Sequence, residues 1–247
     1  MSSFCSNFNP KQPHIITEGA VSYELGELKG KVISYDFQKI LIYLEAKGKL
    51  LFGRQFKIYE EDHEVLLKLV TYYIQDKSYC EHLGLDIEKG IMLSGPVGCG
   101  KTTLMKLLPC IAPYKKPYKI IPARNIVFGF NNLGHKIIED YSDNQSYCFD
   151  DLGVEATGKH FGADCNVMGE ILLSRYDINS ISSFQNSYPH NVIPSAVEVR
   201  VTRNKTHATT NLNAQELEEK YGERVRSRMR SMFNLIAFKR ESLDKRK

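Results

Sequence analysis

The chain has 247 residues, of which 42% are hydrophobic and 25% are charged, and its formal net charge is +4. These proportions are typical of a globular protein, and they exclude a disordered chain, a collagen-like repeat and a coiled-coil rod. Its purely apolar stretches are far shorter than the roughly 20 residues of a membrane-spanning helix. Residues 1–15 lack the pattern of a secretory signal. We therefore expect a cytoplasmic protein without membrane contact, its six cysteines reduced.

The first quarter of the chain carries mainly helical signals. Residues 1–20 are polar and are expected to be loose, whereas apolar spacing predicts helices over 35–46 and 60–75. A break at 47–54, which contains two glycines, separates the two helices. We therefore expect residues 1–54 to be a small, mainly helical segment that binds a partner, followed by a core domain over residues 55–247.

From residue 90 onward, short apolar strands alternate with helical patterns. The expected strands are 90–94, 118–121, 147–149, 205–210 and 232–238, and the expected helices are 101–108, 125–140, 167–176, 213–220 and 222–230. This alternation predicts an α/β fold, a three-layer phosphate-loop core in which helices cover a five-stranded parallel sheet. The connection over residues 177–204 is long, and a loop of such length is either functional or disordered.

A glycine-rich motif follows the first of these strands. Gly95, Gly100, Lys101 and Thr102 match the phosphate-loop pattern GxxxxGK[ST]. The glycines let the backbone fold around a phosphate chain and point its N–H groups inward. Lys101 is expected to reach the β- and γ-phosphates, and the Thr102 hydroxyl to hold Mg²⁺. We therefore predict that ATP and Mg²⁺ bind to the loop Gly95, Pro96, Val97, Gly98, Cys99, Gly100, Lys101, Thr102 and Thr103.

Two adjacent acids end the strand expected at 147–149. In phosphate-loop enzymes an acid at this place holds Mg²⁺, a role that we assign to Asp150. A second acid can deprotonate an attacking water, and we assign this role to Asp151. The alternative is an aspartate-rich turn without chemistry. A water-activating acid favours hydrolysis and disfavours a small-molecule kinase.

Polar and basic residues near the end of the chain complete the candidate site. Asn211 follows the strand at 205–210 and is expected to hold the attacking water, although it could instead cap the next helix. Arg224 and Arg228 are four residues apart and share one face of a helix. They form either a solvated basic surface or an arginine finger for a neighbouring subunit. Residues 224–247 carry nine lysines and arginines against two acids, an excess that is either solvated or in contact with nucleic-acid phosphates.

Three motifs downstream of the phosphate loop resemble those of the DnaC-type helicase loaders, AAA+ ATPases related to the transposition helper ATPase IstB. The motifs are Asp150–Glu155, Thr209–Leu212 and Tyr221–Met229, and the resemblance covers roughly residues 56–238. It implies hydrolysis of Mg-ATP at subunit interfaces of a homo-oligomer. Asn211 takes the place of sensor 1, and Arg228, with Arg224 beside it, that of the arginine finger. Nine residues follow Phe238, too few for the helical lid of most AAA+ proteins, and the DnaC and IstB branch resembles such a lidless core.

The resemblance leaves the partner open. A DnaC-like protein delivers a replicative DNA helicase to single-stranded DNA, which it binds without sequence preference. An IstB-like protein serves a transposase, and a third alternative is a nucleotide-gated adaptor with little turnover. The motifs favour the helicase loader modestly.

Overall fold

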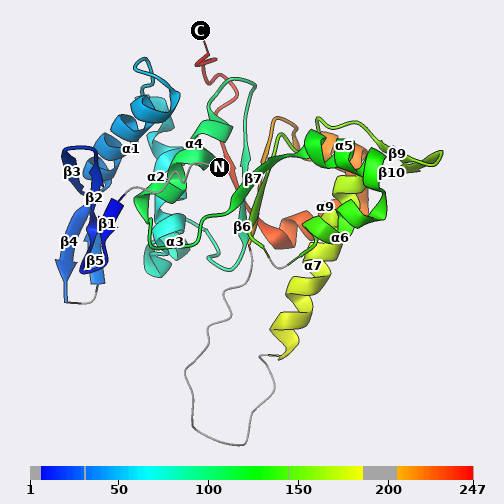
Figure 1. The fold of residues 1–247 in the computed structure, drawn as a ribbon, viewed down its shortest axis with the longest axis horizontal. Helices are drawn as coiled ribbons and strands as arrows, with labels where there is room; N and C mark the ends of the chain where they lie inside the picture. The colour runs from blue at the N-terminus through cyan, green and yellow to red at the C-terminus, as the bar shows by residue number, and fades with distance from the viewer. Residues whose placement is uncertain (1–6, 31, 144, 186–204, 247) are drawn as a thin grey trace, which may run out of the picture. The chain divides into compact units, whose positions relative to one another are not determined.

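The computed structural model describes residues 7–30, 32–143, 145–185 and 205–246, which divide into two compact units (Figure 1). The N-terminal unit comprises residues up to 87 together with 95–118 and those from 236 onward. The sheet unit comprises residues 88–94 and 119–235. Within the described ranges, no helix has both the length and the apolar character needed to cross a membrane.

The N-terminal unit begins with five short strands. β1 (Asn7–Asn9), β2 (Gln12–Glu18) and β3 (Val21–Glu24) form an antiparallel sheet in this order, and β4 (Gly26–Lys29) pairs with β5 (Val32–Tyr35). The expectation of a mainly helical segment over residues 1–54, with a loose start, is therefore wrong. Only a few residues of these strands are buried, so the period-two pattern is too weak to stand out in the sequence.

Helix α1 (Phe37–Phe52) follows these strands and is longer than expected. The Asp36 side chain caps it by accepting hydrogen bonds from the backbone N–H groups of Gln38 and Lys39 at 2.8 and 3.1 Å. The break expected at 47–54 starts later, because only the second of its glycines, Gly53, ends the helix. Gly48 lies inside the helix, where a Cβ would meet the ring of Phe56 at 2.1 Å. Glycine at this place therefore permits close packing and does not end the helix.

The remaining helices of this unit are short. They are the 3₁₀ turn η1 (Glu60–Asp62), α2 (His63–Ile74), α3 (Lys77–His82), α4 (Lys101–Leu107) and the 3₁₀ turn η2 (Leu108–Ile111). Helix α3 was not expected, whereas α2 and α4 lie within the predicted helical ranges.

The sheet unit contains a five-stranded parallel sheet, which confirms the predicted α/β fold. Its strand order is β12–β6–β11–β8–β7, with bounds Phe233–Ala237, Gly90–Ser94, Thr206–Thr210, Tyr147–Asp150 and Lys119–Pro122. Strand β11 pairs in parallel with both β6 and β8, and β8 with β7. β8 and β11 are buried along their whole length, as expected for central strands of a parallel sheet.

Helices pack against this sheet and share a core with it (Figure 1). They are α5 (Ala123–Leu133), α6 (His135–Tyr141), α7 (Val167–Gln185), α8 (Ala214–Tyr221) and α9 (Glu223–Met232), and a hairpin of β9 (Gly158–His160) and β10 (Ala163–Cys165) precedes α7. The helix expected at 125–140 is divided at Gly134, whose φ is 62°. The connection expected at 177–204 starts inside α7, and its part from 186 to 204 lies outside the described residues.

A buried arginine ties the loop before β8 to helix α7 and strand β11. The Arg175 guanidinium donates hydrogen bonds to the carbonyls of Tyr141, Asp143 and Gln145 at 3.0, 2.9 and 2.7 Å. It also donates to the Thr206 hydroxyl at 2.8 Å. Burial lowers the pKa of Arg175 to about 10, so the group remains charged at neutral pH. These four acceptors offset the cost of burying that charge.

Candidate functional site

The phosphate loop belongs to the N-terminal unit and begins one residue after β6 ends. Gly98 and Gly100 have φ angles of 87° and 100°, a backbone region that favours glycine. A Cβ at Gly95 would meet the Phe238 Cβ at 2.7 Å, so glycine is required there by close packing. The buried side chain of Lys101 donates from Nζ to the carbonyls of Gly95 and Pro96, both at 2.8 Å.

These residues fit a magnesium–nucleotide complex. Left-handed glycines within a short loop are the backbone arrangement that turns successive N–H groups toward an anion. Thr102 lies in the first turn of α4, and its hydroxyl is a hard oxygen ligand of the kind that Mg²⁺ prefers, as is the Asp150 carboxylate. The roles of these residues toward nucleotide and Mg²⁺ stay a prediction.

The two candidate acids belong to the sheet unit, where one threonine contacts both of them. Asp150 is the last residue of β8 and is buried, whereas Asp151 is exposed and has a φ of 54°. The Thr209 hydroxyl donates to Asp150 Oδ1 at 2.7 Å and accepts the Asp151 backbone N–H at 2.9 Å. Strand β11 thus fixes the carboxylate of the first acid and the backbone of the second.

Thr209 has no role predicted from the sequence, although it begins the motif Thr209–Leu212. The signal that could have identified it is its place in the strand adjacent to β8, one residue before that strand ends. This placement requires the strand order, which the sequence does not specify.

The carboxyl ends of β6, β11 and β8 lie at one edge of the sheet. Thr210 pairs with Ser94, and Ala208 pairs with Phe149, so Asn211 follows β11 at the edge where Asp150 ends β8. Asn211 is exposed. The alternative that it caps helix α8 is wrong because a different residue, Asn213, forms that cap.

The cap of α8 is a capping box. The Asn213 side chain accepts hydrogen bonds from the backbone N–H groups of Gln215 and Glu216 at 2.9 and 3.0 Å, and the Glu216 carboxylate accepts the Asn213 backbone N–H at 2.7 Å. Asn211 is therefore not needed for this helix, and its predicted role toward water stays a prediction.

The arginines of α9 have different surroundings. The Arg228 guanidinium lies over the Tyr176 ring of α7, 4.4 Å from its centroid, and is half-buried. Arg224 is exposed, and Arg230 lies 3.8 Å from the Glu218 carboxylate. Helix α9 is thus not uniformly solvated, and the arginine-finger role of Arg228 and Arg224 remains a prediction.

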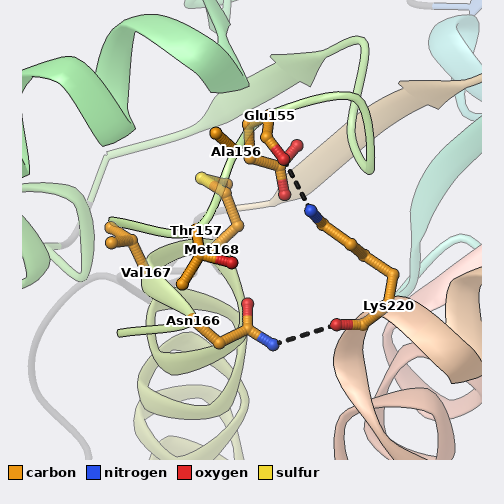
Figure 2. Close-up of a pocket in the computed structure, with 7 residues that line it drawn as sticks. All are labelled: Glu155, Ala156, Thr157, Asn166, Val167, Met168 and Lys220. Carbon is orange, nitrogen blue, oxygen red and sulfur yellow. Dashed lines mark hydrogen bonds between the residues drawn. The ribbon is translucent and has the colours of Figure 1, made fainter. Parts of the chain in front are cut away.

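A buried glutamate connects the loop after the acids to helix α8. The Glu155 carboxylate accepts the Tyr221 hydroxyl and the Gly153 backbone N–H, the latter at 2.8 Å. Burial, with Glu155 nearby, raises the pKa of Tyr221 above its usual value, so the phenol donates in its neutral form. Lys220 Nζ donates to the Glu155 carbonyl at 2.6 Å (Figure 2). The loop after the acids is therefore joined to the end of α8, the helix that precedes the arginine-bearing α9, within the sheet unit.

Figure 2 also shows a small cavity beside this connection. Its volume is about 80 Å³, and it is lined by Glu155, Ala156, Thr157, Asn166, Val167, Met168 and Lys220. Asn166 Nδ2 donates to the Lys220 carbonyl across its lower side at 3.3 Å. The cavity has room for only a few water molecules and is far too small for a nucleotide.

No known protein-family model matches the chain. Over 114 residues it is 28% identical to the ATP-dependent zinc metalloprotease FtsH of Bacillus subtilis (strain 168), and the match covers 46% of this chain but only 17% of FtsH. The crystal structure of the DnaC helicase loader has a TM-score of 0.48 and 18% identity, over 74% of this chain and 92% of that one. AMPPCP-bound DnaA from Aquifex aeolicus has a TM-score of 0.43 and 16% identity, over 74% and 48%. The chain is thus distantly similar in sequence to FtsH, and in fold to DnaC and DnaA.

Proposed function

We propose that the chain is an Mg²⁺-dependent ATPase. The observation that carries this proposal is that Thr209 holds two adjacent acids, Asp150 and Asp151, in a chain whose sequence also contains the phosphate-loop pattern. The loop N–H groups and Lys101 bind the phosphates, and Thr102 and Asp150 supply ligands for Mg²⁺. Magnesium neutralises charge on the phosphates when bound.

Asp151 is the proposed general base. Its exposed position gives water access to the carboxylate, and its backbone is fixed by Thr209. Asn211, at the same edge of the sheet, orients the water. Asp151→Asn should keep Mg-ATP binding but lower phosphate release by roughly 10²–10⁴-fold, the usual contribution of a general base. Asp164→Asn is a matched control because Asp164 is also exposed and lies in the β10 hairpin. Equal rates for the two variants would refute the role of Asp151.

We propose further that ATP is hydrolysed between subunits of a homo-oligomer, with Arg228 and Arg224 acting on the neighbouring site. Arg228→Ala should bind ATP nearly normally but hydrolyse it at least about 10³-fold more slowly. A mixture of Arg228→Ala and Lys101→Ala subunits should recover activity. At a shared interface the first variant supplies an intact phosphate loop and the second supplies the arginine.

The same mixture made with Arg224→Ala tests the second arginine, and Arg230→Ala is the control on the same helix. Arg228 lies over Tyr176 of its own chain, so a finger role requires its guanidinium to leave that ring. No recovery in either mixture, with both variants folded and assembled, would show that neither arginine acts across an interface.

The proposed biological role is that of a helicase loader in DNA replication, and its support is the order of the three motifs that resemble the DnaC type. The partner is then a replicative helicase, with non-specific binding of single-stranded DNA. Capture of a hexameric helicase from the native host would support this role. Capture of a transposase instead would indicate a transposition helper, and tight ATP binding without turnover would indicate a nucleotide-gated adaptor.

A further inference from the structure

The basic segment of residues 239–246 does not lie free in solvent along its whole length. The Lys245 side chain is only 14% exposed, whereas that of its neighbour Arg246 is 63% exposed. Lys245 Nζ bonds to the Asp62 carboxylate at the start of α2. It also lies 5.3 and 5.2 Å from the ring centroids of Tyr59 and Phe238. The expectation that every cation of this segment is solvated or meets nucleic acid is therefore wrong for Lys245.

Lys245 also holds two consecutive carbonyls of the phosphate loop. Its backbone N–H donates to the Gly98 carbonyl at 3.1 Å, and its Nζ donates to the Cys99 carbonyl at 3.0 Å. The approach is close, because a Cβ at Gly98 would lie 2.1 Å from Asp244 Oδ1. The loop and this segment belong to the same unit.

These two contacts determine which way the following N–H groups point. In a trans peptide the C=O and the N–H of one peptide unit point in opposite directions, and the described residues contain no cis peptide. With the carbonyls of Gly98 and Cys99 directed at Lys245, the N–H groups of Cys99 and Gly100 are directed away from it. The Cys99 N–H donates to the Pro96 carbonyl of the same loop at 3.5 Å. An anion bound on that side therefore meets the Gly100 N–H already oriented, and reaches the Cys99 N–H in place of this long internal bond.

Lys245 itself is not suited to bind the anion. Its ammonium is paired with the buried Asp62 carboxylate, and the Glu61 carboxylate lies 3.9 Å away. Its positive charge is therefore compensated within the unit, and its remaining hydrogen bond is donated to a backbone carbonyl. This arrangement differs from that of Lys101, whose Nζ contacts only groups of the loop among its described hydrogen-bond partners.

We propose that Lys245 is a positioning residue, anchored on Asp62, which holds the peptide units after Gly98 and Cys99 in the orientation that binds phosphate. The local part of this inference stands on the contacts alone, and its consequence for ATP rests on the proposed function. Loss of the ammonium leaves the Cys99 carbonyl without its donor and the loop with more than one accessible orientation, so nucleotide affinity falls without loss of any atom that touches nucleotide.

The test compares Lys245→Met with Arg246→Met in the full chain. Methionine retains an apolar stem beside Tyr59 and Phe238 but removes the ammonium, and Arg246 is the adjacent, exposed cation. Cys99 is fully buried in the loop, so its alkylation by iodoacetamide in nucleotide-free buffer, followed by peptide mass spectrometry, reports loop opening. We expect roughly tenfold faster alkylation of Cys99 in Lys245→Met, as for loss of one charge-assisted hydrogen bond, and no change in Arg246→Met. Calorimetry with Mg-ATP should show a Kd raised by a similar factor.

Three other measurements keep the inference falsifiable. Cys80 and Cys110 are buried in the same unit, and equal acceleration at these residues would show that Lys245 stabilises the whole unit, which overturns the local role. Asp62→Asn should reproduce the Cys99 effect, since the anchor is lost while Lys245 is present. If the unchanged chain binds no ATP, the proposed function fails, yet Cys99 alkylation still decides the positioning role. The positioning role is refuted if Lys245→Met shows the same rate of Cys99 alkylation and the same Kd for Mg-ATP as the unchanged chain.

Discussion

Substitution of Thr209 by valine tests whether strand β11 controls the two acids. The side chain is fully buried, and valine keeps its shape while removing the hydroxyl. Two hydrogen bonds are lost: the one donated to Asp150 Oδ1 at 2.7 Å and the one accepted from the Asp151 N–H at 2.9 Å. The next residue provides a control, because Thr210 is equally buried and also makes two hydrogen bonds. Its hydroxyl donates to the Leu152 carbonyl at 2.7 Å and accepts the Leu212 N–H at 3.1 Å, without contact to either acid.

The expected losses differ in a defined way. A hydrogen bond to a charged group contributes about 1.5–3 kcal/mol and a neutral one about 0.5–1.5 kcal/mol. Thr209→Val should therefore lower the free energy of unfolding by about 2–4 kcal/mol, and Thr210→Val by about 1–3 kcal/mol. The rates of ATP hydrolysis of the two variants should differ more clearly than their stabilities. A carboxylate released from its donor is misplaced, and a misplacement of about 1 Å costs on the order of 10²-fold in rate. Thr210→Val should stay within a few-fold of the unchanged chain.

The assay combines urea unfolding with phosphate release at saturating Mg-ATP, below the temperature at which either variant begins to unfold. The unfolding curve gives the folded fraction of each variant, and dividing the rate of phosphate release by this fraction compares the folded proteins. If Thr209→Val hydrolyses ATP as fast as Thr210→Val, the threonine is only a buried packing residue, and the argument that β11 positions the acids is refuted.

Three further predictions concern stability. Arg175→Lys should lower the free energy of unfolding by about 3 kcal/mol in urea, because one ammonium cannot reach four acceptors; an unchanged midpoint would contradict this. Burial lowers the pKa of His207 to about 3. As the pH falls below about 6.5, this imidazole is therefore protonated in the unfolded chain but stays neutral in the folded one. Stability is then complete above pH 6.5 and about 2 kcal/mol lower at pH 5. His207→Asn, which can still accept the Ile91 N–H, should lose that dependence. Gly48→Ala should destabilise by about 1–3 kcal/mol despite its better helix propensity, since its Cβ meets Phe56; stabilisation would refute that packing.

The sequence predicted the parallel sheet well because its strands have a strong local signal. β6 and β8 are short apolar runs between turns, and both were placed within about one residue of their observed bounds. The strands of residues 7–35 were missed because they bury few side chains, such as His14 and Ile16 in β2. Hydrophobic periodicity measures burial, so a sheet that is largely exposed escapes it.

The candidate site divides in the same way. Lys101 and Asp150 belong to motifs that are contiguous in sequence, so spacing alone made them candidates. Thr209 meets Asp150 across 59 residues, and Lys245 meets Cys99 across 146. No pattern within a short window carries these contacts, because they depend on which strand lies beside which and on how the last described residues fold back.

The number of cations in a stretch of sequence does not show how many of them are available to bind a nucleic acid. The nine cations after residue 223 were expected to be either solvated or in contact with nucleic-acid phosphates, yet their surroundings in the fold differ. Lys245 is paired with Asp62, and Arg228 lies over Tyr176, whereas Arg224 and Arg246 are exposed. Only exposed cations can replace counterions on a nucleic acid, since a cation with an internal partner must first lose that partner. The count of nine therefore overstates how many of these cations are available to a nucleic acid, and Lys245 instead contacts the phosphate loop.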